Sequence, residues 1–276
     1  MKELTTLTPA EFARFRALIY QRTGISTADG KVTLLSNRIR RRLRHLGVDT
    51  FAAYYDLLVA GRTEGEWQAF IDAITTNETF FFRSPEHLAW LAGPWLDELT
   101  AAAAARTRGR SIAVWSAAAS SGEEAYSVAI CLAEAAGRLS GWRLSVLGTD
   151  ISETAVTAAR AGVYGARAVE QVGPERLARH FAVNAPAGTW TIRSAARNLC
   201  RFERHNLLDP APGGPFDCIL IRNVLIYFDK ASKKAALDNL VAALAPGGHL
   251  IVGTTDGAHE HLAALERRST FAYRKP

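Results

Sequence analysis

The chain has 276 residues, of which 48% are hydrophobic and 22% charged, and this composition excludes a disordered or low-complexity protein. No apolar run approaches the roughly 18 residues needed to cross a bilayer, and the N-terminus lacks a signal-peptide stretch. We therefore expect a cytoplasmic protein without direct membrane insertion. The net charge of +6 favours an acidic partner without choosing between nucleic acid and protein. The three cysteines form no CxxC pair, so we expect no disulfide framework and no metal site.

Residues 1–75 carry helical patterns and predict a small all-helical domain. The segment TPAEF is typical of a helix start, with Thr8 as N-cap and Glu11 completing a capping box. Two later helical segments are predicted over 51–60 and 64–74. No strand pattern interrupts this region.

A second helix of this domain is predicted over residues 34–46 and is strongly basic. Its leucine and isoleucine residues fall on one stripe, which predicts a buried face. The other faces carry four arginines, namely Arg38, Arg40, Arg41 and Arg44. These side chains form either a docking surface for an acidic partner or an ordinary solvated helix face.

Residues 110–276 alternate apolar runs with helical patterns, which is typical of parallel strands joined by crossover helices. We predict a doubly wound α/β sheet, preceded by a linker and junction helix over residues 76–109. The expected strands cover 111–117, 143–150, 216–223 and 247–255. Short pieces between them, including TWTIRSA and LCRFERH, predict a small inserted β-subdomain over about 165–205.

In open α/β sheets the ligand lies outside the carboxyl ends of the strands, so the residues after each strand are candidates for a site. The first strand leads into AAASSGEEAYS, whose small residues let a ligand approach backbone N–H groups. Glu123 and Glu124 repel phosphate but suit a ligand with sulfonium and ammonium groups. The alternatives are a tight turn and two carboxylates favoured by the helix dipole.

Asp150 ends the second strand, where an acidic side chain can accept both hydroxyls of a ribose. Its alternative role is the N-cap of the next helix, although Ser152 lies closer to that helix. Asn206 and Asn223 follow two other strand-like runs and either flank the same crevice or cap turns. A ribose-binding acid without a GxGxxG phosphate loop favours S-adenosylmethionine over a dinucleotide.

The segment TTNETFFFR at residues 75–83 joins the two predicted domains. Its three phenylalanines are explained by a hydrophobic plug. The neighbouring polar residues Asn77, Thr79 and Arg83 are not, so they are further candidates for the site.

Taken in order, the motifs TTNETFFFR, WSAAASSGEEAYS, GTDISETAVTAARAGVY, FDCILIRNVLIYFD and LAPGGHLIVGTTD resemble those of the bacterial CheR-type chemotaxis receptor methyltransferases. The resemblance spans nearly the whole chain. It implies an N-terminal helical domain on a Rossmann-like S-adenosylmethionine-dependent methyltransferase sheet with an inserted β-subdomain. It further implies methylation of glutamate side chains on chemoreceptors, giving glutamyl methyl esters and S-adenosylhomocysteine, in sensory adaptation.

The resemblance also implies site residues. The expected cofactor contacts are Asn77, Thr79, Arg83, Glu124, Asp150, Asn206, Leu207, Arg222 and Asn223. We hypothesise that Arg83 and Tyr227 orient the incoming carboxylate. The receptor's methylation region is helical and acidic, so the four arginines of the basic helix become its predicted docking surface, on an enzyme that we expect to be a monomer.

Two other readings remain open. A nucleic-acid methyltransferase shares the fold and cofactor, but amino-group methylators carry Asn-Pro-Pro-aromatic where Asn223 is here followed by Val224, so we expect no nucleic-acid partner. A non-catalytic cofactor-sensing or receptor-binding module is the second alternative. The segment Gly253 to Asp256 departs from the family's Gly-x-Ser-Glu pattern and leaves the role of its acid open.

Overall fold

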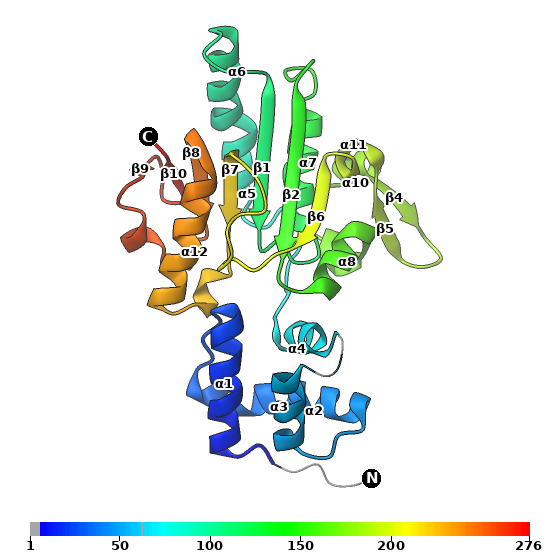
Figure 1. Ribbon diagram of the computed structural model, residues 1–276. Coiled ribbons are helices and arrows are strands. Elements are labelled where there is room, and N and C mark those ends of the chain that lie inside the picture. Colours follow the sequence, from blue (N-terminus) through cyan, green and yellow to red (C-terminus); the bar gives the residue numbers. More distant parts are fainter. Residues whose placement is uncertain (1–5, 62, 64) are drawn as a thin grey trace.

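The structure, a computed structural model, describes residues 6–61, 63 and 65–276 (Figure 1). Residues 1–5 of the predicted helical domain and Glu64, the predicted start of its last helix, lie outside the described residues. Within the described part of the chain, no helix is long and apolar enough to span a bilayer.

Among the described residues, the N-terminal unit at the bottom of Figure 1 holds the α-helices α1 Pro9–Thr23, α2 Val32–Leu46, α3 Phe51–Ala60 and α4 Glu66–Ile74, with a 3-10 turn over Asp29–Lys31. The predicted capping box is present, since the Glu11 N–H donates to the Thr8 hydroxyl at 3.3 Å and the Thr8 N–H donates to the Glu11 carboxylate at 2.9 Å. The apolar stripes of the helices meet in one core. Its fully buried members include Phe15, Ile39 and Leu43.

The main sheet has seven strands in the order β6-β2-β1-β7-β8-β10-β9. All neighbouring pairs from β6 to β8 are parallel, and β10 is antiparallel to both β8 and β9. The bounds are β1 Ser111–Ala117, β2 Arg143–Asp150, β6 Cys200–Arg204, β7 Phe216–Ile221, β8 Leu244–Val252, β9 Glu266–Arg267 and β10 Ala272–Arg274. The predicted doubly wound α/β class is confirmed.

Helices cover both faces of this sheet. One face packs against α7 Glu123–Glu134, α8 Glu153–Ala161 and the junction helices α5 Pro85–Trp90 and α6 Leu96–Ala104, which a π-helical turn over Leu91–Trp95 connects. The other face packs against α12 Lys230–Ala243. Each face buries its own apolar cluster, as expected for strands with near-continuous hydrophobic runs.

A small antiparallel sheet of β3 Val163–Gly165, β5 Thr189–Ile192 and β4 Phe181–Asn184 forms the inserted subdomain, in the order β3-β5-β4. The short helices α9 Ala166–Val169, α10 Pro174–His180 and α11 Ser194–Arg197 accompany it.

The assignment of LCRFERH to this subdomain is wrong, because its strand β6 pairs parallel with β2 at the edge of the main sheet. A short edge strand has too few residues to reveal by pattern which sheet it joins. The Phe202 ring of β6 packs over Gly148 of β2. A Cβ at Gly148 would lie 2.5 Å from this ring, so the two strands fit together only with glycine at that position.

The helical unit rests on the carboxyl-end side of the main sheet. Ile25 forms an isolated bridge with Phe228, and the Asn206 side-chain amide donates to the Arg22 carbonyl at 2.9 Å. On the other side of the contact, the Thr154 hydroxyl donates to the Asp72 carboxylate at 2.7 Å. These contacts place the helical unit directly over the strand ends.

Candidate active site

One pocket lies at the carboxyl ends of the neighbouring strands β6, β2, β1 and β7, enclosed by the junction segment and the helical unit. It holds about 1120 Å³ of space, its solvent-open mouth included. Every predicted cofactor contact and the predicted carboxylate-orienting tyrosine line it. These residues are Asn77, Thr79, Arg83, Glu124, Asp150, Asn206, Leu207, Arg222, Asn223 and Tyr227.

Asp150 occupies the end of β2 and is 7% exposed. Its carboxylate accepts the N–H groups of Ser120 and Ser152, each at 2.9 Å. Burial raises the pKa of Asp150, and these N–H donors oppose that shift. Ser152, not Asp150, is the N-cap of α8, because its hydroxyl accepts the Ala155 N–H at 3.2 Å. Each carboxylate oxygen of Asp150 retains a lone pair for a ligand hydroxyl.

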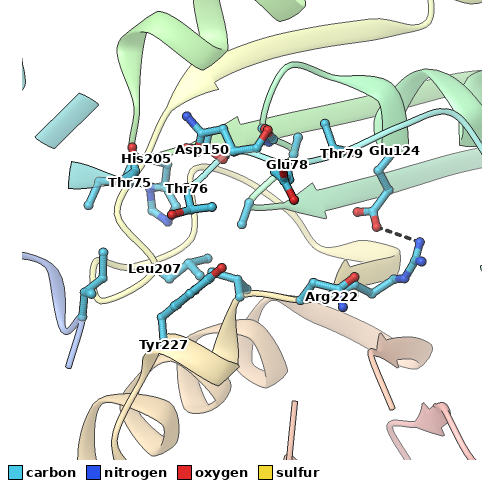
Figure 2. A pocket seen from close by; sticks show the side chains of 18 of the residues that line it. Thr75, Thr76, Glu78, Thr79, Glu124, Asp150, His205, Leu207, Arg222 and Tyr227 are labelled. Atoms are coloured by element: carbon cyan, nitrogen blue, oxygen red, sulfur yellow. Dashed lines mark hydrogen bonds and ion pairs between the residues drawn. The ribbon is translucent and has the colours of Figure 1, made fainter. Parts of the chain in front are cut away.

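Glu124 and Arg222, joined by a dashed line at the right of Figure 2, form an ion pair with 3.0 Å between Oε2 and Nη1. The Arg222 side chain is 3% exposed and also donates to the Arg83 carbonyl at 2.7 Å. Glu124 additionally accepts the Ser116 hydroxyl at 2.7 Å. The pair therefore ties β1, α7 and β7 to the junction segment, and it presents both signs of charge.

The neighbouring Glu123 does not line the pocket. Its carboxylate accepts the Ser121 hydroxyl at 2.7 Å, and burial raises its pKa. The two adjacent glutamates thus have different roles, because successive helix positions point about 100° apart.

The backbone around the pocket adopts left-handed conformations at several non-glycine residues. Ala118, Ser120 and Asn223 line the pocket with φ values of 68°, 51° and 57°. Such conformations cost on the order of 1 kcal/mol each and cluster at functional sites. Here they turn the chain sharply after β1 and β7, at the residues that line the pocket.

Asp256 supports the turn at Asn223. Its carboxylate accepts the Asn223 N–H at 2.8 Å, it is fully buried, and burial raises its pKa. A Cβ on Gly253 would lie 2.2 Å from Asp256 Oδ2, so a glycine is required beside this contact. Asp256, the acid of the altered Gly253–Asp256 segment, therefore does not line the pocket but holds the pocket residue Asn223 in position.

The junction segment contributes both buried phenylalanines and residues of the pocket wall. Phe81 and Phe82 are buried, and their N–H groups donate to the Ala168 carbonyl and the Ser127 hydroxyl, both at 2.9 Å. Phe80 instead lines the pocket beside Arg83, whose guanidinium donates to the Glu78 carbonyl at 3.1 Å.

The four predicted docking arginines lie outside the pocket and divide into two groups. Arg41 and Arg44 are exposed. Arg38 donates to the Ile74 carbonyl and, at 2.8 Å, to the Thr76 hydroxyl, so it holds the start of the junction segment. Arg40 is half-buried, with its guanidinium 5.9 Å from the Phe51 ring.

Sequence reasoning missed His205, which follows β6 and lines the pocket with Ile151 and Ser120. Burial lowers the pKa of His205, whose ring lies 5.6 Å from the Trp115 ring. The sequence could have indicated His205, because it follows directly after a parallel strand, where site residues are expected. Assigning that strand to the subdomain concealed it.

The donor set fits S-adenosylmethionine on its chemistry. The buried carboxylate of Asp150 suits two ribose hydroxyls, and the ion pair of Glu124 with Arg222 suits an aminoacyl group. Leu207, Ile25 and Phe228 supply apolar surface in the same wall.

Two family profiles cover most of the chain. The profile described as "CheR methyltransferase, SAM binding domain" matches residues 77–271, and "CheR methyltransferase, all-alpha domain" matches residues 10–75. The chemotaxis protein methyltransferase of Salmonella typhimurium is 41% identical, over 99% of this chain and 92% of that protein. The protein of the same name from Escherichia coli K12 is 40% identical, over 98% and 91%. Chemotaxis protein methyltransferase 2 of Pseudomonas aeruginosa is 38% identical, over 90% and 87%.

Proposed function

The chain belongs to the CheR methyltransferase family, and on that premise we propose that it methylates the side-chain carboxylates of chemoreceptor glutamates. The products are glutamyl methyl esters and S-adenosylhomocysteine. One observation carries the proposal: the residues expected to hold the cofactor come from separate segments of the chain and line a single pocket.

We assign cofactor roles from the chemistry of the wall. Asp150 accepts the ribose hydroxyls, and Glu124 accepts the ammonium group. Asn206 and Leu207 contact the adenine side, whereas Arg222 and Asn223 contact the methionine side. The remaining contacts come from Asn77, Thr79 and Arg83 of the junction segment. The bound cofactor supplies a methyl group activated by its sulfonium.

The attacking group needs no general base, because a glutamate carboxylate with a pKa of about 4.3 is ionised near neutral pH. The protein's contribution is position: nucleophile, methyl group and leaving sulfur must lie in line. Arg83 and Tyr227 both line the pocket and orient the carboxylate. Arg83 donates to the Glu78 carbonyl through Nη1, which fixes the position of its guanidinium and leaves its other N–H groups for the substrate.

We propose that the acidic helical region of the receptor docks beside α2. Arg41 and Arg44 are the exposed cations there, and charge complementarity with an acidic helix favours this orientation. Arg38 and Arg40 are the other two arginines of this predicted docking surface on α2, and Arg38 also contacts the pocket residue Thr76.

The test is transfer of labelled methyl from S-adenosylmethionine to a cytoplasmic chemoreceptor fragment. We expect an alkali-labile label on the fragment, lost when its acceptor glutamates are replaced by glutamine. Asp150→Ala should abolish transfer. Label appearing in nucleic acid, or S-adenosylhomocysteine binding without transfer to any receptor fragment, would contradict the proposal.

A further inference from the structure

The pocket continues outward into a second cavity, which we call the outer groove. It shares Asn77, Arg83, Asn223 and Tyr227 with the pocket, so a chain lying in it passes directly over the reacting centre. The groove adds four residues that the pocket lacks, namely Gly165, Arg167, Ala168 and Ile226. Its walls are therefore the junction segment, the β3–α9 corner of the subdomain and the turn after β7.

Positive charge dominates this groove. Arg83 lines it from the junction segment, and Arg167 lines it from α9. Arg38 lies at its edge, where it donates to the Thr76 hydroxyl at 2.8 Å. Among the described residues lining it, Glu78 supplies the only carboxylate.

Arg167 pairs with Glu78 at 3.3 Å, but the two side chains are 86% and 75% exposed. An exposed ion pair of this kind contributes little to the stability of the protein. The Arg167 guanidinium can therefore exchange Glu78 for a carboxylate of a bound partner at little cost.

The same groove offers an apolar contact. Ile226 is 48% exposed although it directly precedes the pocket residue Tyr227. Its position beside the pocket mouth suits an apolar side chain of the partner.

We propose that the outer groove binds the residues flanking the acceptor glutamate, with an acidic side chain on Arg167 and an apolar one on Ile226. On a helical substrate these flanking residues lie three or four positions from the acceptor, on the same face. The groove then determines which glutamates are methylated. This inference rests on the proposed function.

The experiment compares Arg167→Glu with Arg179→Glu, an exposed arginine of α10 in the same subdomain and outside the groove. The substrate is a chemoreceptor fragment that the unmodified protein methylates, in versions with glutamate or glutamine three and four residues from the acceptor. We expect Arg167→Glu to raise KM at least tenfold on the glutamate version and to leave S-adenosylhomocysteine affinity unchanged. Arg179→Glu should leave KM within twofold.

A charge reversal completes the test. When the flanking glutamate of the substrate is replaced by lysine, the KM of Arg167→Glu should return toward that of the unmodified protein on the glutamate version. The same replacement should raise the KM of the unmodified protein. Ile226→Ser should raise KM without changing cofactor affinity. Equal KM for Arg167→Glu and the unmodified protein, or no dependence on the flanking charge, overturns the groove assignment. Absence of methylation by the unmodified protein overturns the proposed function instead.

Discussion

The pocket and helix α2 both concentrate charged side chains but use them differently. In the pocket, Asp150 and Arg222 are buried, Glu124 is half-buried, and each has hydrogen-bond or ion-pair partners within the protein. On α2, Arg41 and Arg44 extend into solvent. A buried charge depends on its partners and contributes strongly when they are present, whereas an exposed one contributes little and is screened by salt. The two regions should therefore respond to substitution on different scales.

The largest effect should come from Asp150→Ala. Hydrogen bonds to a charged group contribute about 1.5–3 kcal/mol each, so losing two to a ribose should weaken S-adenosylhomocysteine binding at least a hundredfold. Calorimetric titration measures this, with Glu153→Ala, a half-buried carboxylate outside the pocket, as the control. Thermal unfolding should show that both variants remain folded. Binding within threefold of the unmodified protein would refute the ribose assignment.

Arg83→Ala should reduce turnover more than it weakens cofactor binding. If Arg83 orients the carboxylate, kcat should fall on the order of thirtyfold through lost alignment, while the Kd for S-adenosylhomocysteine changes less than threefold. Steady-state kinetics with saturating receptor fragment separates the two quantities. A change confined to Kd would reassign Arg83 to cofactor binding alone.

Arg38→Ala is a substitution on α2 that should nevertheless weaken cofactor binding in the pocket. Arg38 lies on α2 but holds Ile74 and Thr76, which line the pocket, so its loss should weaken S-adenosylhomocysteine binding roughly five- to tenfold. Arg41→Ala is the matched control and should leave cofactor binding unchanged. If the two variants bind the cofactor equally well, Arg38 belongs with the docking residues only.

The stability contributed by the region behind the pocket should depend on pH. His87 is buried against Phe271, and burial, aided by Arg222, lowers its pKa to about 4. Its folded pKa lies below the unfolded value of about 6.5, so stability is lost as pH falls through the interval between them. The loss from pH 7.5 to 5.5 should be on the order of 1 kcal/mol.

Urea unfolding of His87→Phe at these two pH values should show that loss removed. The control is His45→Phe, which deletes an exposed imidazole of α2. An unchanged pH slope in His87→Phe would place the titration elsewhere.

The smallest effect should be docking by α2. Arg41→Ala and Arg44→Ala should each weaken receptor-fragment binding about two- to fivefold at low salt, and the difference should vanish near 0.5 M salt because exposed charges are screened. Binding by fluorescence anisotropy across a salt series measures this. Salt-independent losses would indicate direct, desolvated contacts instead.

Local signals in the sequence were sufficient for much of the fold. The capping box at Thr8 and Glu11 and strands β1 and β2 follow from residues adjacent in the chain. Asp150 and Glu124 were also predictable, because parallel strands bring their carboxyl ends together whatever lies between them.

Contacts between distant segments were not predictable in the same way. The helical pattern of α2 shows which face is buried, but it does not reveal that Arg38 binds a residue 38 positions away. The place of β6 and the support that Asp256 gives to Asn223 likewise depend on packing across the fold. These tertiary contacts are the parts that required the structure.

The pocket wall begins at Thr23 and ends at Phe228 along the chain. At about 5–20 residues per second, a ribosome needs roughly 10–40 s to synthesise the segment between them. A ligand can stabilise only a state that binds it, so the cofactor cannot assist the nascent helical unit. Until the last wall residue emerges, that unit's own buried core, and not the cofactor, is available to stabilise it. Cellular cofactor levels therefore influence the survival of the finished enzyme but not the first stage of its biogenesis.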